Sequence, residues 1–99
     1  MVSYNVFIKT EKEIENDFAQ WFRKEHIPQI IATGCFEGFI LSRQIEPIDN
    51  GNKVLVCRFF CKSFAEYQHY INDFSKKMRD DFPERFLNKY KISRTVEQR

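Results

Sequence analysis

His26 is the residue whose type and position point most directly to chemistry. A histidine ionises near neutral pH, so its ring can act as an acid, a base or a partner for an anion. It follows Phe22 by four residues, at the flank of a helical apolar pattern, and precedes Pro28 by two. The alternative is a structural role, in which the ring hydrogen-bonds a backbone carbonyl that the proline leaves free. We take His26 as the candidate catalytic residue, although the structural role is slightly favoured because the sequence fixes no second catalytic group.

A second set of residues would line a small-molecule site. Arg58 and Arg94 lie within strand-like segments. Arginines that face a pocket favour a carboxylate-bearing ligand, because a guanidinium donates two parallel hydrogen bonds to a carboxylate. Simple exposure at the rim of a sheet explains these charges as well, and ordinary core packing explains the other members of the set. The candidate ligand-binding residues are Asn5, Trp21, Phe39, Arg58, Tyr67 and Arg94.

Neither a metal site nor a cofactor is indicated. The chain has three cysteines and two histidines, without the CxxC or HxxxH spacing typical of metal sites. Cys57 and Cys61 would lie about 13 Å apart on one strand at ~3.3 Å per residue, too far for a disulfide. We therefore expect reduced thiols, no metal ion and no bound cofactor.

Charge and hydropathy exclude several classes of partner. Sixteen basic and 14 acidic residues give a formal net charge of +2, and their interleaving argues against nucleic-acid binding. Residues 58–60 also lack the glycine of the aromatic RNA-binding pattern. The chain begins in a strand pattern rather than a secretory leader, and no segment reaches ~18 consecutive apolar residues. We expect a cytoplasmic protein that binds neither nucleic acid nor membrane.

The apolar patterns arrange these residues on one small α+β fold. Residues 13–31 have helical spacing, with a kink or restart expected near Pro28. A second helix begins at Ser63 with a capping-box pattern that ends in Glu66, and Asn50-Gly51 is typical of a hairpin turn. Strands are expected at residues 2–9, 36–45, 53–61 and 90–96, a short turn at 81–86 and a frayed end at 97–99. This order predicts one domain over residues 1–99 with the ferredoxin-like βαββαβ fold, a four-stranded antiparallel sheet with two helices on one face.

Both faces of this sheet carry apolar residues. Successive strand residues point to opposite faces, and Phe7 follows Val6 just as Leu41 follows Ile40. Because both helices cover one face, the other would be a large exposed apolar patch, which monomers rarely show. Two such sheets facing each other would bury the patch in a barrel-like core. The sequence therefore predicts a homodimer through the open sheet face, as in a dimeric α+β barrel.

Several short motifs resemble a family of small, mostly bacterial proteins of unknown function. They are Tyr-Asn-Val at 4–6, the helix with Trp21, Glu-His-Ile-Pro at 25–28 and Ala-Thr-Gly-Cys-Phe at 32–36. The family resembles the dimeric α+β barrel superfamily, which includes antibiotic-biosynthesis monooxygenases and haem-degrading enzymes. The resemblance covers nearly the whole chain and implies fold and dimerisation, but not a reaction. The haem-degrading members use an Asn, a Trp and a His; Asn5 and His69 match, whereas the third strand has no Trp.

Two functional hypotheses remain open, and no reaction is assignable. The first is a cofactor-independent monooxygenase-like enzyme or binder, with a small apolar or carboxylate-bearing ligand between helices and sheet. It predicts an open apolar pocket beside His26. The second is a non-catalytic dimeric module, which predicts a filled interior and a His26 ring locked by hydrogen bonds.

Overall fold

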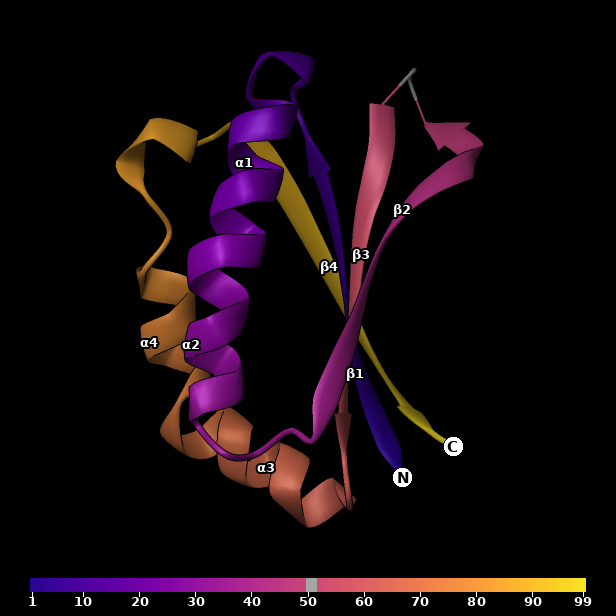
Figure 1. Cartoon of the computed structure of the whole chain (residues 1–99), viewed down its shortest axis with the longest axis vertical. Coiled ribbons are helices and arrows are strands. Elements are labelled where there is room, and N and C mark those ends of the chain that lie inside the picture. The colour runs from indigo at the N-terminus through magenta and orange to yellow at the C-terminus, as the bar shows by residue number, and fades with distance from the viewer. Residues whose placement is uncertain (50–51) are drawn as a thin grey trace.

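Four strands form one antiparallel sheet in the order β2-β3-β1-β4, and the helices lie on one of its faces (Figure 1). The computed structural model describes residues 1–49 and 52–99. Its strands are β1 (Val2–Thr10), β2 (Gly38–Asp49), β3 (Asn52–Cys61) and β4 (Tyr90–Gln98). Its helical segments are η1 (Lys12–Ile14), α1 (Glu15–Trp21), η2 (Phe22–His26), α2 (Ile27–Ala32), α3 (Phe64–Asp73), α4 (Ser75–Asp80) and η3 (Glu84–Phe86). This is the α+β ferredoxin-like fold that the sequence predicts.

The first helical segments follow one another from Lys12 to Ala32, and the helical backbone continues across Pro28. A proline has no N–H and cannot donate to the carbonyl of Lys24, four residues before it. The chain accommodates this with a π-helical turn, η2, after which the Ile27 N–H donates to the Phe22 carbonyl, five residues back. α2 follows directly, and Gly34 comes after its end in the left-handed region at φ 79°. The restart predicted near Pro28 is therefore present, as the wider turn that ends at His26 and the α-helix that begins at Ile27.

The second helical segment starts where the sequence predicts but is divided in two. Ser63 Oγ accepts a hydrogen bond from the Glu66 N–H at 3.3 Å, which is one half of the predicted capping box. Phe74 then leaves helical geometry, with φ −127°, and separates α3 from α4. Ser75 begins α4 and is buried, so the division places a hydroxyl in the core. The short η3 turn follows Pro83, within the predicted residues 81–86.

The outer strands are longer than their own patterns predict. β4 continues to Gln98, and the Arg99 N–H donates to the Met1 carbonyl at 2.7 Å, so the predicted frayed end at 97–99 is wrong. Pairing with β1, where Val2 lies opposite Gln98, extends the strand beyond its apolar part. β2 likewise runs to Asp49, past its expected end at residue 45. The predicted Asn50-Gly51 turn lies outside the described residues.

Aromatic rings fill much of the core between the sheet and the helices. The even-numbered residues of β1 from Val2 to Ile8 are all buried on this side. Phe18 of α1 is fully buried, and its ring centroid lies 5.0 Å from that of Phe86. These contacts hold the helical layer and the segment before β4 against the sheet.

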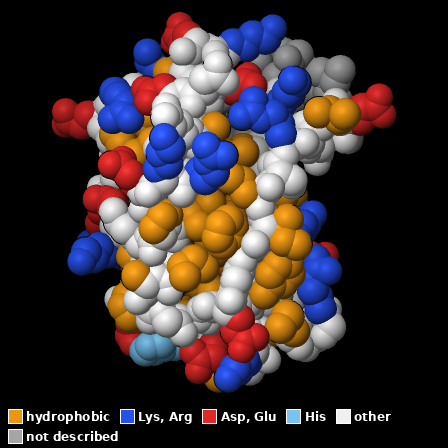
Figure 2. Space-filling model, viewed as in Figure 1, with side chains coloured by type: hydrophobic (Ala, Val, Ile, Leu, Met, Phe, Trp, Pro, Cys, Tyr) orange, Lys and Arg blue, Asp and Glu red, His pale blue; other side chains and the backbone are white. Residues whose placement is uncertain are grey.

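The sheet face away from the helices is only partly apolar. β1, β2 and β3 place Phe7, Ile40, Val56 and Phe60 on it. Ile40 is 56% exposed, and Figure 2 shows apolar side chains along β2, both toward the helices and on the side away from them. β4 contributes only polar side chains to this face, namely Lys91, Ser93, Thr95 and Glu97. The open apolar surface therefore belongs to three of the four strands.

The burial of Phe18 and the exposure of Phe64 predict different losses of stability when each is replaced by alanine. Phe18→Ala should lower the free energy of unfolding by about 3–5 kcal/mol, because it removes a fully buried ring. Phe64→Ala is the matched control, since Phe64 is 52% exposed, and should change it by about 0.5 kcal/mol or less. Urea unfolding at one fixed protein concentration measures both. Equal losses would contradict this assignment of the core.

Candidate functional site

His26 lies inside the layer between helices and sheet. Its side chain is 5% exposed. The ring centroids of Trp21, Phe22 and Phe82 lie 5.0, 5.2 and 4.8 Å from the imidazole. Phe22 and His26 are the first and last residues of η2, so the π-helical turn sets where the imidazole enters the core.

A small cavity adjoins this ring. Its volume is ≈ 20 Å³, enough for one water molecule and too small for a larger ligand. Two buried atoms of its lining residues, His26 Nδ1 and Ser75 Oγ, have no hydrogen-bond partner among the described residues. Because buried polar atoms are nearly always partnered, a molecule in the cavity is the simplest way to satisfy both.

Two arginines add positive charge to the cavity. Arg79 comes from α4 and Arg94 from β4, and neither has a carboxylate within ion-pair distance in the described part of the chain. Burial raises the pKa of the Tyr4 hydroxyl, and the charge and hydrogen bonding of Arg94 beside it offset part of that rise. The other lining residues are mostly apolar: Val6, Phe22, Ile30, Phe59, Met78 and Ile92. The site therefore combines positive charge with apolar walls.

Burial sets the protonation state of His26. Desolvation lowers the pKa of the imidazole to about 4, while the Asp81 carboxylate raises it slightly and the Arg94 guanidinium lowers it. The ring is therefore neutral at pH 7, with one nitrogen able to donate and the other able to accept a hydrogen bond. A neutral imidazole can accept a proton from a ligand, whereas the attraction of an anion falls to the arginines.

Trp21, Tyr67 and Phe39 lie around the core but outside the cavity lining. Trp21 packs against His26, and the Tyr67 ring centroid lies 5.5 Å from that of Tyr4. Phe39 is 42% exposed at the edge strand β2. Of the predicted ligand-binding residues, Arg94 joins His26 at the cavity, and the roles of all of them remain predictions.

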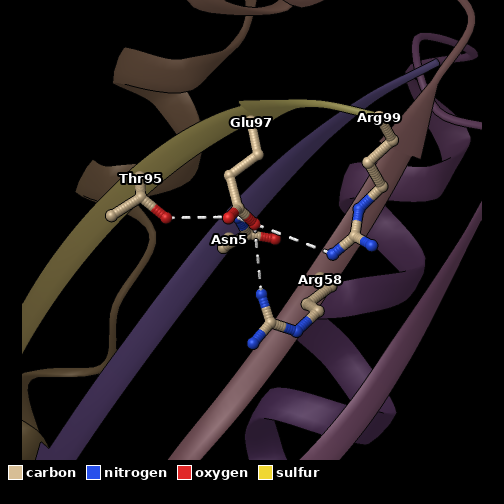
Figure 3. Close-up of polar contacts among 5 residues, drawn as sticks. All are labelled: Asn5, Arg58, Thr95, Glu97 and Arg99. Atoms are coloured by element: carbon tan, nitrogen blue, oxygen red, sulfur yellow. Dashed lines mark hydrogen bonds and ion pairs between the residues drawn. The ribbon is translucent and has the colours of Figure 1, made fainter.

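Asn5 and Arg58 lie on the opposite face of the sheet, whereas the sequence places Asn5 between helices and sheet. They are cross-strand neighbours on β1 and β3, and Glu97 joins them (Figure 3). Asn5 Nδ2 donates to Glu97 Oε1 at 2.8 Å and to Thr95 Oγ1 at 3.1 Å. The Arg58 guanidinium lies 3.6 Å from the same Glu97 oxygen. The candidate residues therefore separate into two groups, one on each face.

Asn5 and His69, which match the Asn and His of the haem-degrading proteins, do not lie together. His69 lies on the outer surface of α3, with Nδ1 2.9 Å from the Asp73 carboxylate. Asn5 is fully buried on the far face of the sheet. The structure keeps these two side chains apart.

Sequence reasoning missed several residues of the His26 environment, among them Ser75, Arg79 and Asp81. Ser75 carried a usable signal, because Ile71, Ser75 and Met78 share the helical spacing of a buried stripe. Arg79 and Asp81 carried none, since they lie in a charged stretch that is typical of a solvated helix end. Their part in the site depends on the path of the chain after α4.

Within 1–49 and 52–99, no three His, Cys, Asp or Glu side chains converge as metal ligands would. No helix in these ranges combines the length and the apolar character needed to cross a membrane.

The fold places the chain in the class of ferredoxin-like proteins with an open sheet face. It is similar to an ethyl tert-butyl ether D (EthD) family protein from Bacillus halodurans, with TM-score 0.71 and 13% identity, over 100% of this chain and 99% of that chain. Two dimeric ferredoxin-like proteins from an uncultured marine organism have TM-scores of 0.63 and 0.60 and identities of 12% and 16%. The matches cover 96% and 97% of this chain and 91% and 92% of theirs. Such low identities show the fold alone.

Residues 1–98 match the family described as "Domain of unknown function (DUF4286)", and the chain belongs to that family. None of the curated proteins matches it. A family of unknown function is also what the sequence motifs indicate.

The burial of His26 predicts its titration. Because its folded pKa of about 4 lies below the unfolded value of about 6.5, the unfolded state binds the proton more tightly. The resulting stabilisation, up to about 3 kcal/mol, is complete above about pH 6.5 and is lost as the pH falls through about 4. An NMR titration of the imidazole resonance that disappears in His26→Gln measures the folded pKa. A midpoint near 6.5 would show that the ring is solvated.

Proposed function

We propose that this protein is a homodimer that binds a small carboxylate-bearing or apolar molecule between helices and sheet at His26. The observation that supports the proposal is the set of unmatched polar groups on one cavity. His26 Nδ1 and Ser75 Oγ have no partner, and Arg79 and Arg94 have no carboxylate, among the described residues. No particular reaction is assigned.

The charges of the cavity favour an anionic head group on the ligand. A carboxylate can accept hydrogen bonds from Arg94 and from the Ser75 hydroxyl, while its apolar part packs on Phe22 and Phe82. In a reaction of the cofactor-independent monooxygenase type, a neutral His26 would act as the base toward the substrate.

A ligand larger than water requires the cavity to widen. Phe82 is half-buried and Arg79 is exposed, so both lie on the side of the cavity nearest solvent. Phe82 belongs to the irregular segment between α4 and η3. Its side chain can therefore move without breaking a strand pairing.

A non-catalytic dimeric module is the second candidate. The cavity volume of ≈ 20 Å³ favours it, because the interior is otherwise filled. The unpartnered His26 Nδ1 argues against a non-catalytic module, since a purely structural ring would be held by hydrogen bonds. The two candidates differ in whether a ligand enters.

Dimerisation through the open sheet face is supported by the exposed apolar residues on it. Ile40 is 56% exposed on an edge strand with Phe7 and Phe60 on the same face. Such a surface is typical of a contact between subunits. Two similar structures are described as dimeric ferredoxin-like proteins.

Ligand binding can be tested with acetate and benzoate, which share a carboxylate and differ in size. NMR titration should shift amides around the cavity, and Arg94→Gln should weaken binding roughly tenfold or more, because a charged hydrogen bond is lost. Arg85→Gln is the control, since Arg85 pairs with Asp17 on the outer surface. His26→Ala should weaken binding and, because the ring is buried, also lower the melting temperature, so affinity is measured at a temperature where the variant is folded. A His26→Ala variant with a lower melting temperature but unchanged affinity would contradict a catalytic role of His26.

Dimerisation can be tested by sedimentation equilibrium. The wild-type chain should sediment at twice its monomer mass, and Ile40→Lys should shift it toward monomer by placing a charge in an apolar interface. Leu87→Lys is the control, because Leu87 is 66% exposed but precedes β4 outside the sheet. A monomeric wild-type chain at high concentration would rule out the homodimer.

A further inference from the structure

β2 is an edge strand with little protection against pairing. Among the described strands it pairs with β3 alone, so one row of its backbone N–H and C=O groups faces away from the sheet. From Gly38 to Gln44 its register with β3 has no bulge, and Arg43 is the one charged residue there. Phe39 and Ile40 are 42% and 56% exposed. Charges and bulges keep other strands off an edge, so this part of β2 is open to strand addition.

A hollow of ≈ 390 Å³ lies between this edge and the helical segments. Leu41 of β2, Leu55 of β3 and Ala19 of α1 contribute its apolar lining, and Figure 2 shows apolar side chains gathered between β2 and the helical segments. Because successive side chains of a strand point to opposite faces, a strand added to β2 directs every second side chain toward the helices. The hollow can therefore select among the side chains of an added strand.

The same hollow carries an unmatched positive charge. Two arginines line it, and Arg43 forms an ion pair with Glu15. Arg23 of η2 is exposed and has no carboxylate within ion-pair distance in the described part of the chain. An exposed guanidinium adds little affinity by itself. It favours an acidic side chain over a basic one at this place, because electrostatic complementarity acts mainly on specificity.

We propose that the β2 edge binds an extended segment of a partner protein, which adds a strand beside Gly38–Gln44 and places an acidic side chain at Arg23. Main-chain hydrogen bonds supply the affinity, and the hollow selects an acidic residue flanked by apolar ones. A second copy paired through the same edge fits less well, because its own Gly38–Gln44 segment has no acidic residue. The proposal goes beyond the proposed function, since it uses neither the His26 cavity nor the open sheet face.

Capped peptides of about six residues test this binding, since that is the length of an ordinary strand. One consists of valine and threonine with a central glutamate, and a second has lysine in place of the glutamate. In NMR titrations of the full chain, the glutamate peptide should bind roughly threefold to fivefold more tightly than the lysine peptide. It should also protect β2 amides from solvent exchange. A glutamate peptide with N-methylated valines should bind about tenfold more weakly, because it lacks main-chain donors.

Two variants with the same change of net charge test the role of Arg23. Arg23→Gln should remove most of the preference for glutamate over lysine. Lys24→Gln is the matched control, because Lys24 is the next residue of η2, is exposed and lies outside the lining of the hollow. It should leave the preference unchanged.

Three results would overturn the proposal: equal affinity for the glutamate and lysine peptides, undiminished binding of the N-methylated peptide, or protection of β4 amides instead of β2 amides. Equal loss of the preference in Arg23→Gln and Lys24→Gln would also overturn the assigned role of Arg23. These results leave the proposed dimer and the His26 ligand site intact, because Ile40→Lys and Arg94→Gln test those separately.

Discussion

The structure depends on one constraint, which is that β1 is central in the sheet and has buried residues on both of its faces. Its even-numbered residues pack beneath the helices, and its odd-numbered Ser3 and Asn5 are fully buried on the far face. Val2 to Lys9 of β1 pair with both β3 and β4, so a residue there cannot change face without breaking two pairings. Tyr4 and Asn5 therefore separate the two candidate sites, although they are adjacent in sequence.

Pro28 constrains the helical segments in the way that β1 constrains the sheet. Its missing N–H is accommodated by the π-helical turn from Phe22 to His26. That turn brings His26 among the rings of Trp21 and Phe82, where desolvation keeps the imidazole neutral. The chemical state of the histidine is therefore a consequence of a backbone feature two residues away.

Sequence patterns predicted the fold because it follows from local periodicity. The alternation in β1 and the spacing of Phe18 and Phe22 place each element on its correct face. The prediction of a frayed end at 97–99 is wrong because Glu97 pairs with Ser3 of β1. The polar sequence of this end does not reveal that pairing. Arg58 shares a face with Val56 and pairs with Glu97, a partner that the spacing of residues along the sequence does not reveal. The cavity volume and the position of Arg79 depend on packing between distant segments, which no periodicity encodes.

The polarity of the His26 cavity bears on which candidate function is correct. A gap left by imperfect packing would be apolar, because placing unpaired polar atoms beside it is unfavourable. Most of the lining of this gap is apolar, but it also includes an unpartnered imidazole, a buried hydroxyl and two arginines without carboxylates. A single water can satisfy the imidazole and the hydroxyl, and the two arginines, which are exposed, keep a positive charge beside the gap. Departures from local consistency of this kind concentrate at functional sites, so the charges favour an anionic occupant even though the volume alone favours a filled core.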